Sequence, residues 1–204
     1  MTASRHIAAI PTKYAGCQFR SRLEARWAAF FDLCGWKWDY EPVDLNGYIP
    51  DFVLGFDGAW PDKDLKILCE IKPAFSIEEM DEAMSKIDNA GWPTEALVLG
   101  ATLSMPNQYR AGFNHKVFGS LRDFNWPRLG KDQTPAQTWT EAGLFVCDKN
   151  GTANKHIGFH SNQISHHCRV CGYQFGGWAG IEATGAIETL WREAGNLVQW
   201  KAPA

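Results

Sequence analysis

A short apolar segment that ends in two opposite charges constrains the fold most. Residues 65–72 read LKILCEIK and predict a β-strand. Because side chains alternate across a sheet, Cys69 and Ile71 face one side, whereas Glu70 and Lys72 share the other. Burying a charge costs free energy unless the charge is paired or bound to a metal. The segment therefore predicts a sheet that provides partners for Glu70 and Lys72.

Asp51 is the corresponding charge in the preceding strand, where apolar residues again flank it. If the two strands are neighbours, Asp51 and Glu70 lie close enough to share one divalent cation. Their carboxylates and the backbone carbonyl of Ile71 would supply hard oxygen ligands to Mg²⁺ or Mn²⁺. Such a cation suits phosphodiester hydrolysis, because it stabilises developing charge and lowers the pKa of a bound water. Lys72 would position that water or neutralise the transition state.

The first half of the chain carries a regular alternation of helix and strand signals. Ser21 is an N-cap signal, Gly35 ends a helical stripe, Asn46-Gly47 is a hairpin turn signal, and Ser76 to Glu79 is a capping box. The pattern predicts, in order, a helix over 19–34, strands over 36–40, 48–56 and 65–72, a helix over 76–89 and a strand over 96–100. The predicted order is αβββαβ.

Three motifs in this order resemble a known family. Glu24 on the first helix, Pro50-Asp51, and Glu70-Ile71-Lys72 resemble the PD-(D/E)XK nuclease superfamily, and the run FRSRLEARWAAFFDLCGWKWDYEP resembles the opening of small nuclease-like proteins common in phages. The resemblance covers about residues 17–100. It implies a restriction-endonuclease-like α/β core, in which a mixed central sheet is flanked by helices, and Mg²⁺- or Mn²⁺-dependent cleavage of DNA or, less often, RNA. It also implies catalytic roles for Glu24, Asp51, Glu70 and Lys72.

Each of these acids also has a purely structural interpretation. Glu24 stands three residues after Ser21, so it can be the second half of a capping box. Asp51 can lie in a turn at the start of a strand. Glu70 and Lys72 can be an ion pair on a solvent-exposed face, although this leaves their apolar flanks unexplained.

A second group of chemically active residues lies further along the chain. Cys147, His156, His160, His166, His167, Cys168 and Cys171 fall within 25 positions of one another. Cys168 and Cys171 form a knuckle whose thiolates can bind one Zn²⁺. With Cys147 as a third ligand, a histidine must complete the site, and we expect His160, with His156 in reserve. The structural alternative is a pair of reduced cysteines among surface histidines.

The organisation weakens after residue 101, where Pro and Gly punctuate a stretch without clear periodicity. We therefore expect a nuclease-like core over 1–125 and a small zinc-ribbon-like module over 126–180. A C-terminal helix over 181–194 and a strand over 197–201 are expected to pack on the core.

The expected function is that of a divalent-metal-dependent deoxyribonuclease, with an endonuclease favoured over an exonuclease. The net charge of −3 gives no support to a nucleic-acid partner, but the first 26 residues hold five basic residues against Glu24 alone. Arg20, Arg22 and Arg26 are the expected contacts to double-stranded or branched DNA. The alternatives are a non-catalytic binding protein that reuses the nuclease fold, and an assembly or inhibitor protein that acts through the zinc segment.

The chain lacks an apolar run long enough for a membrane span and the apolar core of a secretory signal. We therefore expect a cytoplasmic protein, in the host cytoplasm if a phage encodes it, with no membrane partner. A homodimer is compatible with these features.

Overall fold

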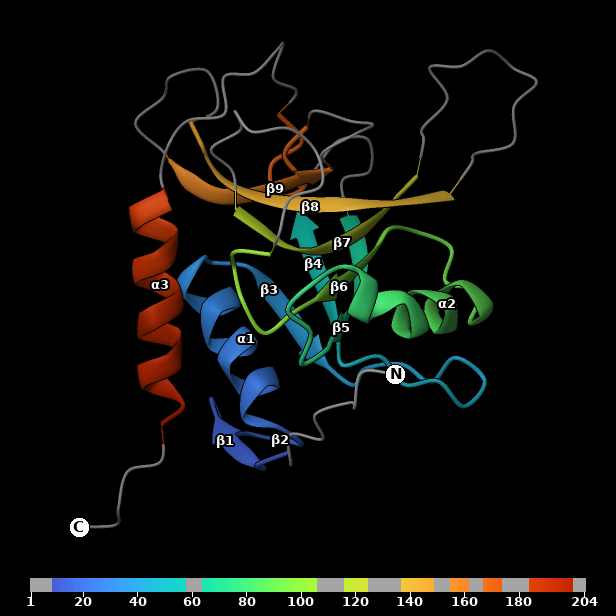
Figure 1. Cartoon of the computed structure of the whole chain (residues 1–204), viewed down its shortest axis with the longest axis horizontal. Coiled ribbons are helices and arrows are strands. Elements are labelled where there is room, and N and C mark those ends of the chain that lie inside the picture. The colour runs from blue at the N-terminus through green and yellow to red at the C-terminus, as the bar shows by residue number, and fades with distance from the viewer. Residues whose placement is uncertain are drawn as a thin grey trace.

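The structure is a computed structural model that describes residues 9–57, 64–105, 116–124, 137–148, 155–161, 167–173 and 184–199. It is an α/β protein built on a mixed seven-stranded sheet in the order β3-β4-β5-β6-β7-β8-β9 (Figure 1). The elements are β1 (Thr12–Tyr14), β2 (Cys17–Phe19), α1 (Arg22–Leu33), β3 (Lys37–Tyr40), β4 (Phe52–Asp57), β5 (Asp64–Ile71), η1 (Glu78–Met80), α2 (Asp81–Asn89), β6 (Ala96–Leu99), β7 (Lys116–Phe124), β8 (Gln137–Cys147), β9 (His156–Ser161) and α3 (Thr184–Leu197).

The predicted order of the first half is confirmed, from α1 through β3, β4, β5 and α2 to β6. The Ser21 side chain caps α1 by accepting a hydrogen bond from the Glu24 N–H, and Gly35 ends the helix at a φ of +70°. Asn46 and Gly47 both have positive φ and form the predicted turn, although it joins only an isolated bridge between Leu45 and Tyr48. The hairpin of β1 and β2 was not predicted, because strands of three residues carry too little alternation.

The predicted capping box before α2 is wrong. The segment begins as the short η1 turn, and no side chain caps either η1 or α2. The Glu79 carboxylate instead accepts a hydrogen bond from the Phe75 N–H at 2.7 Å. The helix predicted over 76–89 is confirmed over Asp81–Asn89, and Met80 and Ile87 pack with Leu68 of β5 in one buried cluster.

The sheet continues past the predicted domain boundary near residue 125. β7 and β8 lie on either side of that boundary and pair antiparallel with each other, and β9 pairs with β8. The described strands of the region 126–180, β8 and β9, therefore continue the sheet of the core. The C-terminal helix is confirmed as α3, which runs through Leu197 and so replaces the start of the strand expected at 197–201. Residues 181–183 of the expected helix and 200–201 of the expected strand lie outside the described residues.

Helices cover both faces of the sheet (Figure 1). α1 and α3 lie side by side on one face, where the Trp27 and Trp191 rings meet with centroids 4.6 Å apart, and α2 lies on the other face. Within the described part of the chain, no helix combines the length and apolar character that a membrane crossing requires.

Candidate metal centres

Two carboxylates converge where β4 begins and β5 ends. Phe52 pairs with Cys69 in the antiparallel register, so Asp51, one residue earlier, lies opposite Glu70. The Asp51 N–H donates to Glu70 Oε2 at 3.4 Å, and the Ile71 N–H donates to Asp51 Oδ2 at 2.7 Å. Directly opposed residues point to the same face of a sheet. The predicted juxtaposition of Asp51, Glu70 and Ile71 is thus present.

Both acids are buried, at 3% exposed for Asp51 and 7% for Glu70. Burial is the largest cause that raises the pKa of Asp51, to about 7, and the nearby charge of Glu70 raises it further. The Ile71 N–H opposes this shift by stabilising the carboxylate. Two buried carboxylates side by side, with the pKa of Asp51 raised by the charge of Glu70, form a donor set that a divalent cation would satisfy.

Glu70 holds two further partners. Its Oε1 accepts from Lys72 Nζ at 2.6 Å and its Oε2 accepts from the Tyr48 hydroxyl at 2.9 Å. Burial and the charge of Glu70 raise the pKa of Tyr48, which keeps this hydroxyl protonated as a donor. Because Glu70 is buried, the ion pair with Lys72 is not a pair on an open solvent face. Sequence analysis missed Tyr48, whose only signal is its place directly after the Asn46-Gly47 turn.

Glu24 lies in a hydrogen-bond network of its own at the start of α1. Its carboxylate accepts from Ser21 Oγ at 2.7 Å, from the Tyr40 hydroxyl at 2.7 Å and from the Arg20 N–H at 3.2 Å. The structural interpretation of Glu24 as a partner of the N-cap is therefore confirmed. Glu24 connects to the carboxylate pair through Arg20, whose Nη2 donates to Asp51 Oδ1 at 2.6 Å.

The three arginines expected to contact nucleic acid lie in different settings. Arg20 binds Asp51 and also Glu41, with Nε 2.9 Å from Glu41 Oε1. Arg22 is exposed. Arg26 packs against α3, where its guanidinium lies 3.8 Å from the centroid of the Trp191 ring. Arg26 is therefore held by the fold, and Arg20 and Arg22 are the more accessible pair.

A second centre brings together Cys147, His156, Cys168 and Cys171, which could hold a metal such as zinc. Their ligand atoms all lie within 4.8 Å of one another. Tetrahedral zinc with Zn–S near 2.3 Å and Zn–N near 2.0 Å separates two sulfurs by about 3.8 Å and a sulfur from a nitrogen by about 3.5 Å. The Sγ atoms of Cys147 and Cys171 are 3.7 Å apart, and Cys168 Sγ lies 3.5 Å from His156 Nε2. These two separations match those expected for zinc, so the cluster could hold that ion.

The expected ligand His160 is wrong, and the reserve His156 takes its place. The antiparallel register pairs Cys147 directly with His156, whereas His160 pairs with Gly143, four residues further along β8. Four residues of strand span roughly 13 Å, too far for a shared ion. His160 Nδ1 instead lies 2.9 Å from the Ser161 carbonyl oxygen, and its ring meets Phe145 edge to face.

The knuckle between Cys168 and Cys171 is a tight turn closed by backbone hydrogen bonds. The Gly172 N–H donates to the Cys168 carbonyl at 2.8 Å, and Gly172 has a φ of +70°, which favours glycine. A hydrogen bond from the Cys168 thiol is the largest cause that lowers the pKa of Cys171, to about 5. The pKa of Cys168 is raised, first by its hydrogen bond with Cys147 and then by the one with Cys171. A thiolate is the form that binds metal.

Arg169, inside the knuckle, anchors it to the sheet. Its side chain is fully buried, with Nε 2.8 Å from Glu95 Oε2 and Nη2 2.9 Å from Asp123 Oδ1. Sequence analysis missed this network, because a lone arginine between two cysteines carries no signal for burial.

Comparison of the chain with protein-family models, curated proteins and solved structures finds no match. The chemistry of the two centres therefore rests on their own geometry.

Proposed function

We propose that the chain is a divalent-metal-dependent nuclease that hydrolyses phosphodiester bonds of DNA, built on a restriction-endonuclease-like core. The convergence of Asp51 and Glu70 at one edge of the sheet, beside Lys72, carries this proposal. The antiparallel pairing of β4 with β5 and the parallel pairing of β5 with β6 support the core assignment.

Asp51, Glu70 and the Ile71 carbonyl are the groups that would hold Mg²⁺ or Mn²⁺. The cation, when bound, would activate a water and stabilise the charge that develops on the phosphate. The burial of both carboxylates strengthens their attraction for a cation, because little solvent screens them.

The remaining polar groups orient this pair. Tyr48 donates to Glu70 and the Ile71 N–H donates to Asp51, so each carboxylate keeps a fixed direction. Lys72 is half-exposed and carries the positive charge closest to Glu70, which suits it to approach a phosphate oxygen. Arg20, which lies just before α1, donates from Nη2 to Asp51 Oδ1 and so also orients that carboxylate.

We propose a structural role for zinc at Cys147, His156, Cys168 and Cys171. Four protein ligands leave no open position, which is typical of structural sites. The metal would tie the knuckle to the paired ends of β8 and β9, and so keep Arg169 in its buried network.

The test is a cleavage assay on linear, circular, branched and single-stranded DNA with Mg²⁺ or Mn²⁺. We expect cleavage by the wild type, background activity for Glu70→Gln, and a loss of about a hundredfold for Lys72→Gln. Asp64→Asn is the matched control, because it removes an exposed carboxylate from the other end of β5.

Wild-type activity in the control variant, together with inactive Glu70→Gln, supports the proposal. Equal cleavage by wild type and Glu70→Gln would identify a contaminant. Absence of cleavage on every substrate would favour the non-catalytic binding protein.

A further inference from the structure

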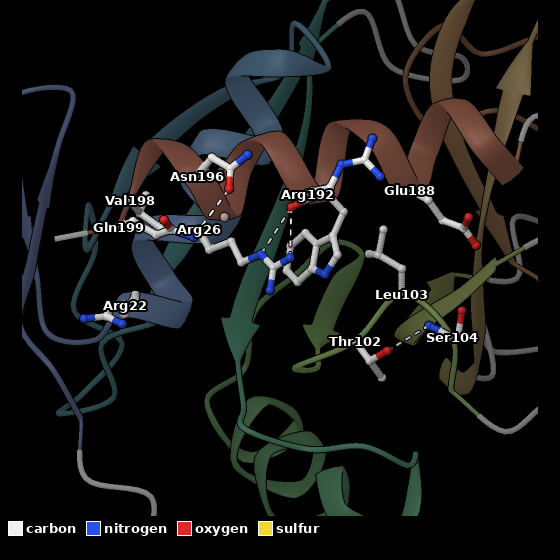
Figure 2. Close-up of a pocket in the computed structure, with 12 residues that line it drawn as sticks. Arg22, Arg26, Thr102, Leu103, Ser104, Glu188, Arg192, Asn196, Val198 and Gln199 are labelled. Atoms are coloured by element: carbon white, nitrogen blue, oxygen red, sulfur yellow. Dashed lines mark hydrogen bonds between the residues drawn. The ribbon is translucent and has the colours of Figure 1, made fainter. Parts of the chain in front are cut away.

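A pocket of about 440 Å³ lies between α1, α3 and the segment that follows β6 (Figure 2). We propose that it binds a backbone phosphate of the nucleic-acid strand, beside the bond that is cleaved. Its placement relative to that bond rests on the proposed nuclease function.

The charge of the pocket favours an anion. Arg22, Arg26 and Arg192 are among its lining residues, and Glu188 is the one acid among the described residues that line it. Lys116 Nζ lies 2.8 Å from Glu188 Oε1 and so offsets that acid. Thr102 and Ser104 add hydroxyl groups on the wall opposite α3 (Figure 2). Arginines with neighbouring hydroxyls are typical contacts to phosphate oxygens.

Arg26 is held in place at the centre of the pocket. Its Nε and Nη2 donate to the Trp191 carbonyl at 3.3 and 2.9 Å. Gly195 permits this placement, because a Cβ there would lie 3.2–3.3 Å from three guanidinium atoms. Among the described residues, Arg26 Nη1 has no hydrogen-bond partner within the chain, so it remains available to a ligand.

The aromatic residue of the pocket favours a phosphate over a base. The Trp191 ring contacts the Arg26 guanidinium at 3.8 Å and the buried Trp27 ring at a centroid distance of 4.6 Å. Base recognition by stacking needs an open aromatic face. Because these contacts cover Trp191, the arginines are the groups that the pocket offers to a ligand.

The pocket and the carboxylate pair share one edge of the sheet. Arg20 and Arg22 flank the N-cap of α1; Arg20 contacts Asp51, and Arg22 lines the pocket. The Lys72 N–H donates to the Leu99 carbonyl at 2.8 Å, and the chain runs on from Leu99 directly into the wall at Thr102. The pocket lies on the face of α1 and α3, whereas Glu70 shares the opposite face with Leu68 and Tyr48, so a strand bound at the carboxylates would reach the pocket by passing around this edge.

The test measures affinity of the full chain for a fluorescein-labelled 16-bp duplex by anisotropy, across a series of salt concentrations and without added Mg²⁺ or Mn²⁺. We expect Arg22→Gln and Arg192→Gln each to weaken binding by about tenfold, the effect of one charge-assisted hydrogen bond. Each should also reduce the slope of log K against log salt by about 0.9. Lys37→Gln, which removes an exposed charge paired with Asp57, is the matched control and should bind as the wild type.

Equal affinities and slopes for Arg22→Gln, Arg192→Gln and Lys37→Gln would overturn the proposal. A parallel titration with inorganic phosphate separates the two sources of the anion: saturable phosphate binding that Arg22→Gln abolishes, with unchanged duplex binding, would also overturn it. If the wild type cleaves DNA and the arginine variants bind it as the wild type does, the proposed phosphate site is wrong and the proposed nuclease function stands. If the arginine variants bind DNA more weakly but the wild type cleaves no substrate, the phosphate site is supported and the nuclease function is not.

Discussion

Asp51 is the residue whose environment departs most from what its charge requires. It is buried beside a second carboxylate, and its compensating contacts in the chain are the Ile71 N–H and the exposed Arg20. A folded-state pKa of about 7 for a group with an ordinary value of 3.8 means that ionised Asp51 destabilises the metal-free fold.

This shift predicts a pH dependence of the free energy of unfolding. A raised folded-state pKa contributes stability that is fully present below the unfolded pKa and is lost as pH rises through the folded pKa. Without added divalent cation, the difference in stability between wild type and Asp51→Asn should therefore move against the wild type from about pH 4 to about pH 7, by an amount on the order of a few kcal/mol. Urea unfolding at several pH values measures it.

Added Mn²⁺ should cancel this loss above pH 7, because it binds the ionised carboxylates. Asp64→Asn should follow the wild type throughout, since Asp64 is exposed. Parallel curves for wild type and Asp51→Asn would show that Asp51 is not strained by its charge.

At the scale of elements, β8, β9 and the knuckle behave as one unit. Phe145, Cys147 and Cys168 form a small buried cluster, whereas Leu144, Val146 and Phe159 on the opposite face join the large core. Gly158 allows the close approach, since a Cβ there would lie 2.4 Å from Cys168 Sγ. A metal at Cys147, His156, Cys168 and Cys171 would hold this small cluster to the strand ends.

Substitution of the two histidines separates the alternatives for the fourth ligand. His156→Ala should lower the zinc content of purified protein from about one equivalent and reduce its Tm, as should Cys168→Ser, because each removes a ligand. His160→Ala should keep the zinc, since its ring lies elsewhere on β9. Mass spectrometry of untagged native protein reads the metal directly. Loss of zinc in His160→Ala with retention in His156→Ala would contradict this assignment.

The helices and strands also show which parts of the fold sequence patterns can predict. Local signals were enough for α1, β3, β4 and β5, because Ser21, Gly35 and the apolar alternation act within a few residues. β7 escaped prediction because Ser120, Arg122 and Asp123 are polar yet at most 1% exposed, which erases the apolar pattern of a buried strand. Their partners, such as Asp88 for Arg122, are distant in sequence.

The candidate sites likewise contain residues that local sequence patterns predict and residues that only the folded chain brings together. Asp51, Glu70 and Lys72 were found because alternation fixes which side chains share a face. The choice between His156 and His160 depends on the register of β8 with β9, which only the folded chain defines. The position of Glu24 in the sequence was compatible with both a capping and a catalytic role; its contact with Ser21 confirms the first, and the second stays a prediction.

At the scale of the whole molecule, the position of individual charges matters more than the net charge. The net charge of −3 provides no general attraction for DNA. Any affinity must come from local groups along one edge of the sheet, where Arg20, Arg22 and Lys72 lie near the buried carboxylates. A cation bound by Asp51 and Glu70 would offset the negative charge of that pair, so the proposed cleavage depends on cation binding.

Calorimetric titration of Mn²⁺ into the zinc-loaded full chain at pH 8 tests that condition most directly. We predict one Mn²⁺ site in the wild type and in Asp64→Asn, and loss of the site in Asp51→Asn and in Glu70→Gln. A wild type that binds no Mn²⁺, or a Glu70→Gln variant that binds it as the wild type does, would contradict the account.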